Sequence, residues 1–176
     1  PLAGLGGSLG LKGSDGQVLR DRLASLSAEQ RHRALDRVAR ALGPLAQAAT
    51  AVNFSTWAGD MGAEALSSLG LAHRVLGQAA TAGSDAGDTR RAVRALREDG
   101  VDLILFAGGD GTARDIFDVI GSSLPVLGIP AGVKMHSGVF AVSPEAAGEL
   151  LLQLVRGGLV GLRAREVRDI DEEAFR

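Results

Sequence analysis

The stretch that decides the fold is Val-Asp-Leu-Ile-Leu-Phe-Ala-Gly-Gly-Asp-Gly-Thr-Ala-Arg-Asp-Ile, residues 101–116. Its first seven residues form an apolar run with one charge, a pattern typical of a strand covered on both faces. Glycines 108, 109 and 111 then surround one carboxylate, Asp110, and apolar residues recur at helical spacing from Ile116. The stretch predicts a parallel strand, a glycine turn and a helix start. Asp110 would lie at the carboxyl end of the strand, where open α/β sheets bind ligands.

Alternation of strands and helices continues through most of the chain. Strands are predicted at 50–54, 71–76, 101–107 and 125–129, and helices begin at Ser27, Gly62, Asp88-Thr89, Thr112 and Ser143-Pro144. The first helix is expected to end at Gly43-Pro44 and the third at Gly100. This order predicts an α/β fold with three layers and an open, mostly parallel sheet. Residues 159–170 alternate between apolar and charged side chains, which indicates a half-exposed strand at a sheet edge or at the start of another domain.

The amino-acid composition argues against several classes of function. The 176 residues are 45% hydrophobic with a net charge of -2, which indicates a folded domain without the basic excess of a nucleic-acid-binding protein. Aromatic residues make up only 3%, which argues against base-stacking platforms. The chain has no cysteine, so disulfides and cysteine zinc sites are excluded. No apolar run approaches the roughly 20 residues that span a bilayer. We therefore expect a cytoplasmic protein with no nucleic-acid or membrane partner.

Three glycine-bearing loops, 1–16, 108–112 and 131–138, would meet at one end of the predicted sheet. Exposed amides beside a helix amino end suit phosphate oxygens. A carboxylate such as Asp110 is compatible with phosphate there if it holds Mg²⁺ or takes a proton from an attacking hydroxyl. Lys134 and His136 could neutralise transferring charge, and Thr112 could donate to phosphate. The pattern favours phosphoryl transfer to an alcohol.

Structural interpretations of the same residues stay open. Gly-Gly-Asp-Gly is also a good tight turn, and loop 1–16 fits neither the dinucleotide fingerprint nor the P-loop. The acids Asp15, Asp85 and Asp88 are interpreted as turn and cap residues. Four arginines of the first helix are interpreted as a solvated face: Arg31, Arg33, Arg37 and Arg40.

The motif Gly108-Gly109-Asp110-Gly111-Thr112 resembles the GGDGT signature of the NAD kinase superfamily, which includes diacylglycerol and sphingoid-base kinases. The opening Pro-Leu-Ala-Gly-Leu-Gly-Gly and the later Gly-Ile-Pro-Ala-Gly-Val-Lys-Met-His-Ser-Gly-Val-Phe-Ala resemble an ATP-NAD kinase branch that includes acetoin-catabolism-X-like proteins. The resemblance implies that Asp110 is the catalytic residue, which activates the 2′-hydroxyl of the NAD ribose. It also implies phosphate contacts from Gly109, Gly111 and Thr112. Further nucleotide or phosphate contacts are predicted from Gly108, Gly132, Lys134 and His136.

On this resemblance, residues 1–160 are expected to form an α/β nucleotide-binding kinase domain. Residues 161–176 would form a strand or linker toward a β-rich carboxy-terminal domain that lies beyond Arg176. The 176-residue chain alone is therefore expected to be poorly active. The expected donor is ATP, or polyphosphate, with Mg²⁺ as cofactor and metal ligands unassigned. The expected partners are ATP and NAD, and the expected assembly is a homo-oligomer.

Two other functions remain open at this point. The loop 130–136 departs from the Asn-Thr-Gly-x-x-Gly-Phe loop of typical NAD kinases, so the acceptor could be another alcohol, a lipid or a small polyol. A non-catalytic nucleotide-binding sensor is the other alternative.

Overall fold

The computed structural model describes residues 34–48, 51–80, 84–131 and 135–158, together with Gly161 and Val167. Within these residues the chain forms a helix over 34–47 and then alternating strands and helices. In chain order these are β1 Phe54–Thr56, the 3₁₀ helix Gly59–Met61, α2 Ala63–Ser68, β2 His73–Val75, α3 Ala86–Asp99, β3 Ile104–Gly108, α4 Asp110–Ile120, β4 Val126–Pro130 and α5 Pro144–Val155. The alternation predicted from the sequence is confirmed.

The strands pair in parallel, as predicted. β1 pairs with β2 from Phe54 opposite His73, and β3 pairs with β4 from Ile104 opposite Val126. Among the described residues these are two separate two-stranded sheets. The α/β class is confirmed, with the strands arranged as two parallel pairs.

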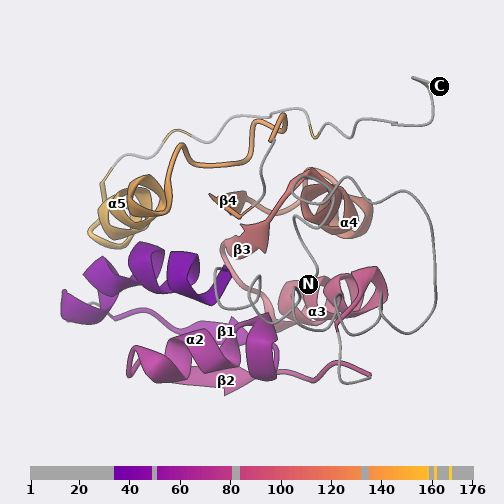
Figure 1. The fold of residues 1–176 in the computed structure, drawn as a ribbon, viewed down its shortest axis with the longest axis horizontal. Coiled ribbons are helices and arrows are strands. Elements are labelled where there is room, and N and C mark those ends of the chain that lie inside the picture. The colour runs from indigo at the N-terminus through magenta and orange to yellow at the C-terminus, as the bar shows by residue number, and fades with distance from the viewer. Residues whose placement is uncertain are drawn as a thin grey trace, which may run out of the picture.

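Side chains of β3 alternate between two apolar clusters, which gives the three predicted layers. Ile104 packs with Val93 of α3 and with Ile116 and Ile120 of α4. Leu105 faces the other side, where Ala41 and Ala147 pack. Figure 1 shows β3 and β4 between α3 and α4 on one side and α5 with the indigo helix 34–47 on the other. Successive residues of a strand point to opposite faces, so one short strand joins both layers of helices.

Helix 34–47 continues through Gly43-Pro44, so the predicted end at that dipeptide is wrong. The reason is tertiary packing, because Leu42 and Leu45 on either side are 3% and 4% exposed and share one core cluster. Burial of two leucines stabilises by about 3–6 kcal/mol. That offsets the cost of about 3 kcal/mol for a proline inside a helix. The helix also packs closely on α5, where a Cβ added at Gly148 would fall 2.3 Å from the Ala41 carbonyl oxygen.

The strand boundaries differ from the predicted ones by a few residues. β3 starts at Ile104 because Val101 still donates its amide to Leu96 at the end of α3, and the ladder to β4 begins with Ile104 donating to Pro125. Pro130 is the last residue of β4, one beyond the predicted end at residue 129, and no strand donor is needed there. The predicted strand over 159–170 lies outside the described residues except for Gly161 and Val167, neither of which is in a strand.

The cap of α3 is Asp85, three residues before the predicted Asp88-Thr89. The Asp85 side chain accepts the Asp88 amide at 2.8 Å, and the Asp88 side chain accepts the Asp85 amide at 3.1 Å. This reciprocal pair is a capping box, in which the third helical residue completes the cap. The predicted stop at Gly100, with φ 76°, and the predicted cap at Ser143 are confirmed.

Asp88 is buried, and its carboxylate has partners in several segments of the chain. It is 1% exposed, accepts the Ala80 amide at 3.0 Å and pairs with Arg91. Burial favours the neutral form of this carboxyl, but the amides of Ala80 and Asp85 and the Arg91 guanidinium outweigh it and lower the Asp88 pKa. Both Asp85 and Asp88 therefore serve as cap residues, as interpreted from the sequence.

We expect Asp88→Asn to lower the melting temperature at pH 7. The folded-state pKa lies below the unfolded one, so the ionised carboxylate stabilises the fold above about pH 4 and loses this effect as the pH falls through its folded pKa. Thermal melts from pH 7 down to pH 3 should show the difference from the wild type shrinking. Asp102→Asn, an exposed acid just after α3, is the control and should leave the melting temperature unchanged. An equal difference at every pH would contradict this account of Asp88.

Candidate active site

Asp110 is the first residue of α4, directly after the strand β3. Gly109 caps the helix in an extended conformation, and Gly108 is the last residue of the strand. The carboxylate therefore lies at the carboxyl end of a parallel strand and beside the free amides of a helix amino end. Both features were predicted from residues 101–116.

Both carboxylate oxygens of Asp110 accept backbone amides from the loop after β4. His136 donates to Oδ2 at 2.8 Å, and Ser137 donates to Oδ1 at 2.9 Å. The structure thus brings together two of the three glycine-bearing loops that the sequence placed at one sheet end. The third loop, 1–16, lies outside the described residues.

These hydrogen bonds keep Asp110 ionised. Partial burial favours the neutral acid, but the Ser137 side chain and the amides of His136 and Ser137 outweigh it and lower the Asp110 pKa. With these three donors, the carboxylate still has a lone pair to spare. Asp110 can therefore accept another donor, such as a substrate hydroxyl, or serve as a metal ligand.

Gly108 and Gly111 differ in what a side chain at each position would contact. A Cβ at Gly108 would lie 2.6 Å from Thr112 Oγ1, so this glycine is required by the Thr112 side chain, which folds back over it. Gly111 is exposed, and a Cβ there would meet nothing within 4 Å. Neither Gly108 nor Gly111 has a positive φ. Packing and backbone conformation therefore do not explain Gly111, whose missing side chain leaves the amino end of α4 open.

The structure describes only some of the other predicted site residues. Gly132 and Lys134 lie outside the described residues. The side chain of His136 is exposed, and its contact with Asp110 is made by the backbone amide. Thr112 is half-buried against Gly108.

Two residues at this edge were missed or misread from the sequence. Ser137 is 6% exposed and was not assigned a role. Arg37, interpreted as part of a solvated face, is half-buried, and its Nη1 donates to the Pro130 carbonyl at 2.5 Å. Arg37 precedes Ala41 by four residues and so shares its helix face, but the burial of Ala41 is known only from the structure. Arg40 is exposed and pairs with Glu145, as a surface residue would.

Among the described residues, the acids do not form a metal cage. In the part of the chain that the structure describes, no three His, Asp or Glu side chains gather in one group. Mg²⁺ at kinase sites is commonly held by one or two carboxylates together with substrate phosphates and waters. One carboxylate at Asp110 fits that mode of binding.

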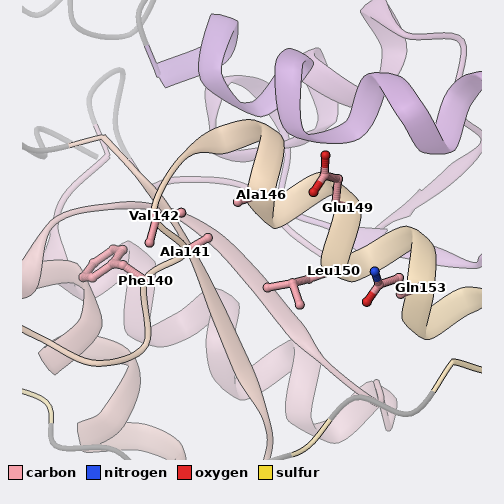
Figure 2. A pocket seen from close by; sticks show the side chains of 7 residues that line it. All are labelled: Phe140, Ala141, Val142, Ala146, Glu149, Leu150 and Gln153. Carbon is pink, nitrogen blue, oxygen red and sulfur yellow. The ribbon is translucent and has the colours of Figure 1, made fainter.

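Two hollows lie beside α5, and Asp110 lines neither of them. Figure 2 shows the smaller one, of about 390 Å³, between Phe140–Val142 and the α5 residues Ala146, Glu149, Leu150 and Gln153. The other is a groove of about 560 Å³ between α4 and α5, lined mostly by apolar side chains such as Phe106, Ile116 and Leu150. Gly138, next to Ser137, also lines this groove. The groove therefore reaches the loop that holds Asp110.

Residues 18–159 match the family model described as the ATP-NAD kinase N-terminal domain. The chain belongs to this family. The resemblance carried by the GGDGT motif is thereby confirmed, and the described fold is that of a nucleotide-binding kinase domain. No helix of the ATP-NAD kinase domain, among its described residues, is long and apolar enough to cross a bilayer.

Among curated proteins, the domain is similar to one named "Probable lipid kinase YegS-like" from Citrobacter koseri. The two are 32% identical over 88 residues, which cover 47% of this chain and 29% of that relative. The aligned segment thus spans less than a third of the relative's length. No solved structure gives a significant match.

We expect Gly111→Ala and Gly108→Ala to separate binding from folding. Alanine at 111 meets no neighbour and suits a helix better than glycine, so the melting temperature should hold or rise. Its methyl group would occupy the open amino end of α4 and weaken MgATP binding at least tenfold in calorimetry. Alanine at 108 would clash with Thr112 and destabilise the fold by about 1–3 kcal/mol. Unchanged MgATP binding by Gly111→Ala would argue against a phosphate at this helix end.

Proposed function

We propose that this protein transfers a phosphoryl group from ATP, or from polyphosphate, to the 2′-hydroxyl of NAD to give NADP. The observation that carries the proposal is Asp110, ionised and held by two backbone amides at the amino end of α4. Membership of the ATP-NAD kinase N-terminal domain family supports it.

The donor phosphates would lie over the amides of Gly111 and Thr112. Anions bind at helix amino ends because the amides there lack partners and the helix dipole is positive. The absence of a side chain at Gly111 lets a phosphate approach the backbone closely. Mg²⁺ bound to the donor phosphates would supply charge neutralisation for the transferring group.

Asp110 would orient the acceptor hydroxyl and receive its proton. The hydroxyl oxygen forms a bond to the γ-phosphorus while the bond to the β-γ bridging oxygen breaks, leaving ADP. A carboxylate with a lowered pKa is a weak base, so the proton would move late, once the new bond has acidified the hydroxyl. The two amides hold the carboxylate in place for this step.

A lipid alcohol is the second candidate acceptor. Two observations favour it: the relative that carries the name of a lipid kinase, and the apolar groove that reaches Gly138. An acyl chain in that groove would bring its head group toward Asp110. A full-length protein that binds nucleotide without forming a product would instead be a sensor.

We expect Asp110→Asn in the full-length protein to abolish transfer and keep the fold. Asparagine can accept one of the two amides with Oδ1, but its NH₂ group cannot accept the other, so the cost in stability should be about 1 kcal/mol. NADP formation should fall by at least a factor of about 10². Asp118→Asn, an exposed acid on the same helix, is the control and should turn over normally. Wild-type turnover in Asp110→Asn would overturn the assigned role.

The acceptor can be identified with labelled ATP and Mg²⁺. We expect label in NAD and none in diacylglycerol or sphingoid base presented in vesicles. Label in the lipid alone would replace NAD with the second candidate. Nucleotide-dependent thermal stabilisation without labelled product would favour the sensor.

A further inference from the structure

Arg37 lies at the same end of the sheet as Asp110 but comes from the opposite layer. Its Nη1 donates to the carbonyl of Pro130, the last residue of β4. Pro130 is the register partner of Gly108, the last residue of β3, and Ala131 donates its amide to the Gly108 carbonyl. One hydrogen bond and one strand pairing therefore connect Arg37 to the glycine that opens the motif.

Arg37 differs from several other arginines in the described chain, although the exposed Arg97 also donates to a backbone carbonyl, that of Val119. Arg40, Arg74, Arg90 and Arg91 each pair with a carboxylate. Arg37 pairs with no carboxylate that the structure describes, although it is half-buried. A guanidinium has five donors, and the Pro130 carbonyl takes one of them. The remaining donors belong to a side chain that this hydrogen bond anchors at the carboxyl end of β4.

We infer that Arg37 binds the phosphate chain of the phosphoryl donor. The inference rests on the proposed function, because it assigns a further residue to the same site. Phosphoryl transfer needs cations around the donor, and a planar guanidinium matches phosphate oxygens better than an ammonium does. The hydrogen bond to Pro130 orients the planar guanidinium before the phosphoryl donor binds. This reduces the conformational entropy lost on binding.

A purely structural role is the competing explanation. Arg37 could serve only to satisfy the Pro130 carbonyl and hold helix 34–47 on β4. Arg37→Gln separates the two roles, because the glutamine amide can still donate to that carbonyl but carries no charge. Arg37→Lys keeps the charge without the planar fork. Arg40→Gln is the matched control, since it removes the same charge one turn further along the same helix from an exposed ion pair.

The test measures binding of inorganic triphosphate and of MgATP to the full-length protein by calorimetry, with melting temperatures and kinetics alongside. We expect Arg37→Gln to weaken triphosphate binding and raise KM for MgATP at least tenfold, with KM for NAD unchanged. Arg37→Lys should lie between Arg37→Gln and the wild type. Arg40→Gln should stay within twofold of the wild type in every measurement.

The outcomes distinguish the two proposals. Equal triphosphate affinity in Arg37→Gln and Arg40→Gln would overturn the role of Arg37 while leaving transfer to NAD intact. A wild-type protein that binds triphosphate through Arg37 but labels no NAD would overturn the proposed function alone. If Arg37→Gln melts early, Arg37→Lys with wild-type melting and wild-type triphosphate affinity would also overturn the inference, because the fork geometry would then have no effect.

Discussion

The site depends on one interaction, the pair of hydrogen bonds from the amides of His136 and Ser137 to the carboxylate of Asp110. It joins two loops that follow neighbouring parallel strands. Partial burial favours the neutral acid, but the Ser137 side chain and these two amides together lower the pKa of Asp110. The same contact holds the loop after β4 across the end of β3. The loop after β4 therefore influences both the pKa of Asp110 and the shape of the site.

The rest of the fold supports this contact from two sides. Ile104 and Ile116 anchor β3 against α4, so the start of α4 is fixed where the strand ends. Ile129, fully buried near Ala41 and Ala147, anchors the end of β4 on the other side. Both loops thus start from the ends of buried strands. Sites built on such ends are more precise than sites on free loops.

The parts that could be predicted from the sequence are those with local causes. The turn from β3 into α4, the cap at Ser143 and the stop at Gly100 follow from a few adjacent residues. The parts that could not be predicted depend on distant partners. Helix 34–47 passes Pro44 because Leu42 and Leu45 are buried by other elements. Arg37 was predicted to be a surface residue because its partner, Pro130, lies 93 positions later in the sequence.

Gly148 connects the packing of two helices with the position of Arg37. Its Cα lies so close to Ala41 that any side chain at 148 would push helix 34–47 away from α5. Because Arg37 is one turn from Ala41 on that helix, such a shift would move its guanidinium away from Pro130. Variation at this buried glycine would then alter the ligand edge of the sheet from a distance. Gly148 therefore sets how closely the two helices can pack, and the helix spacing in turn sets the position of the Arg37 guanidinium.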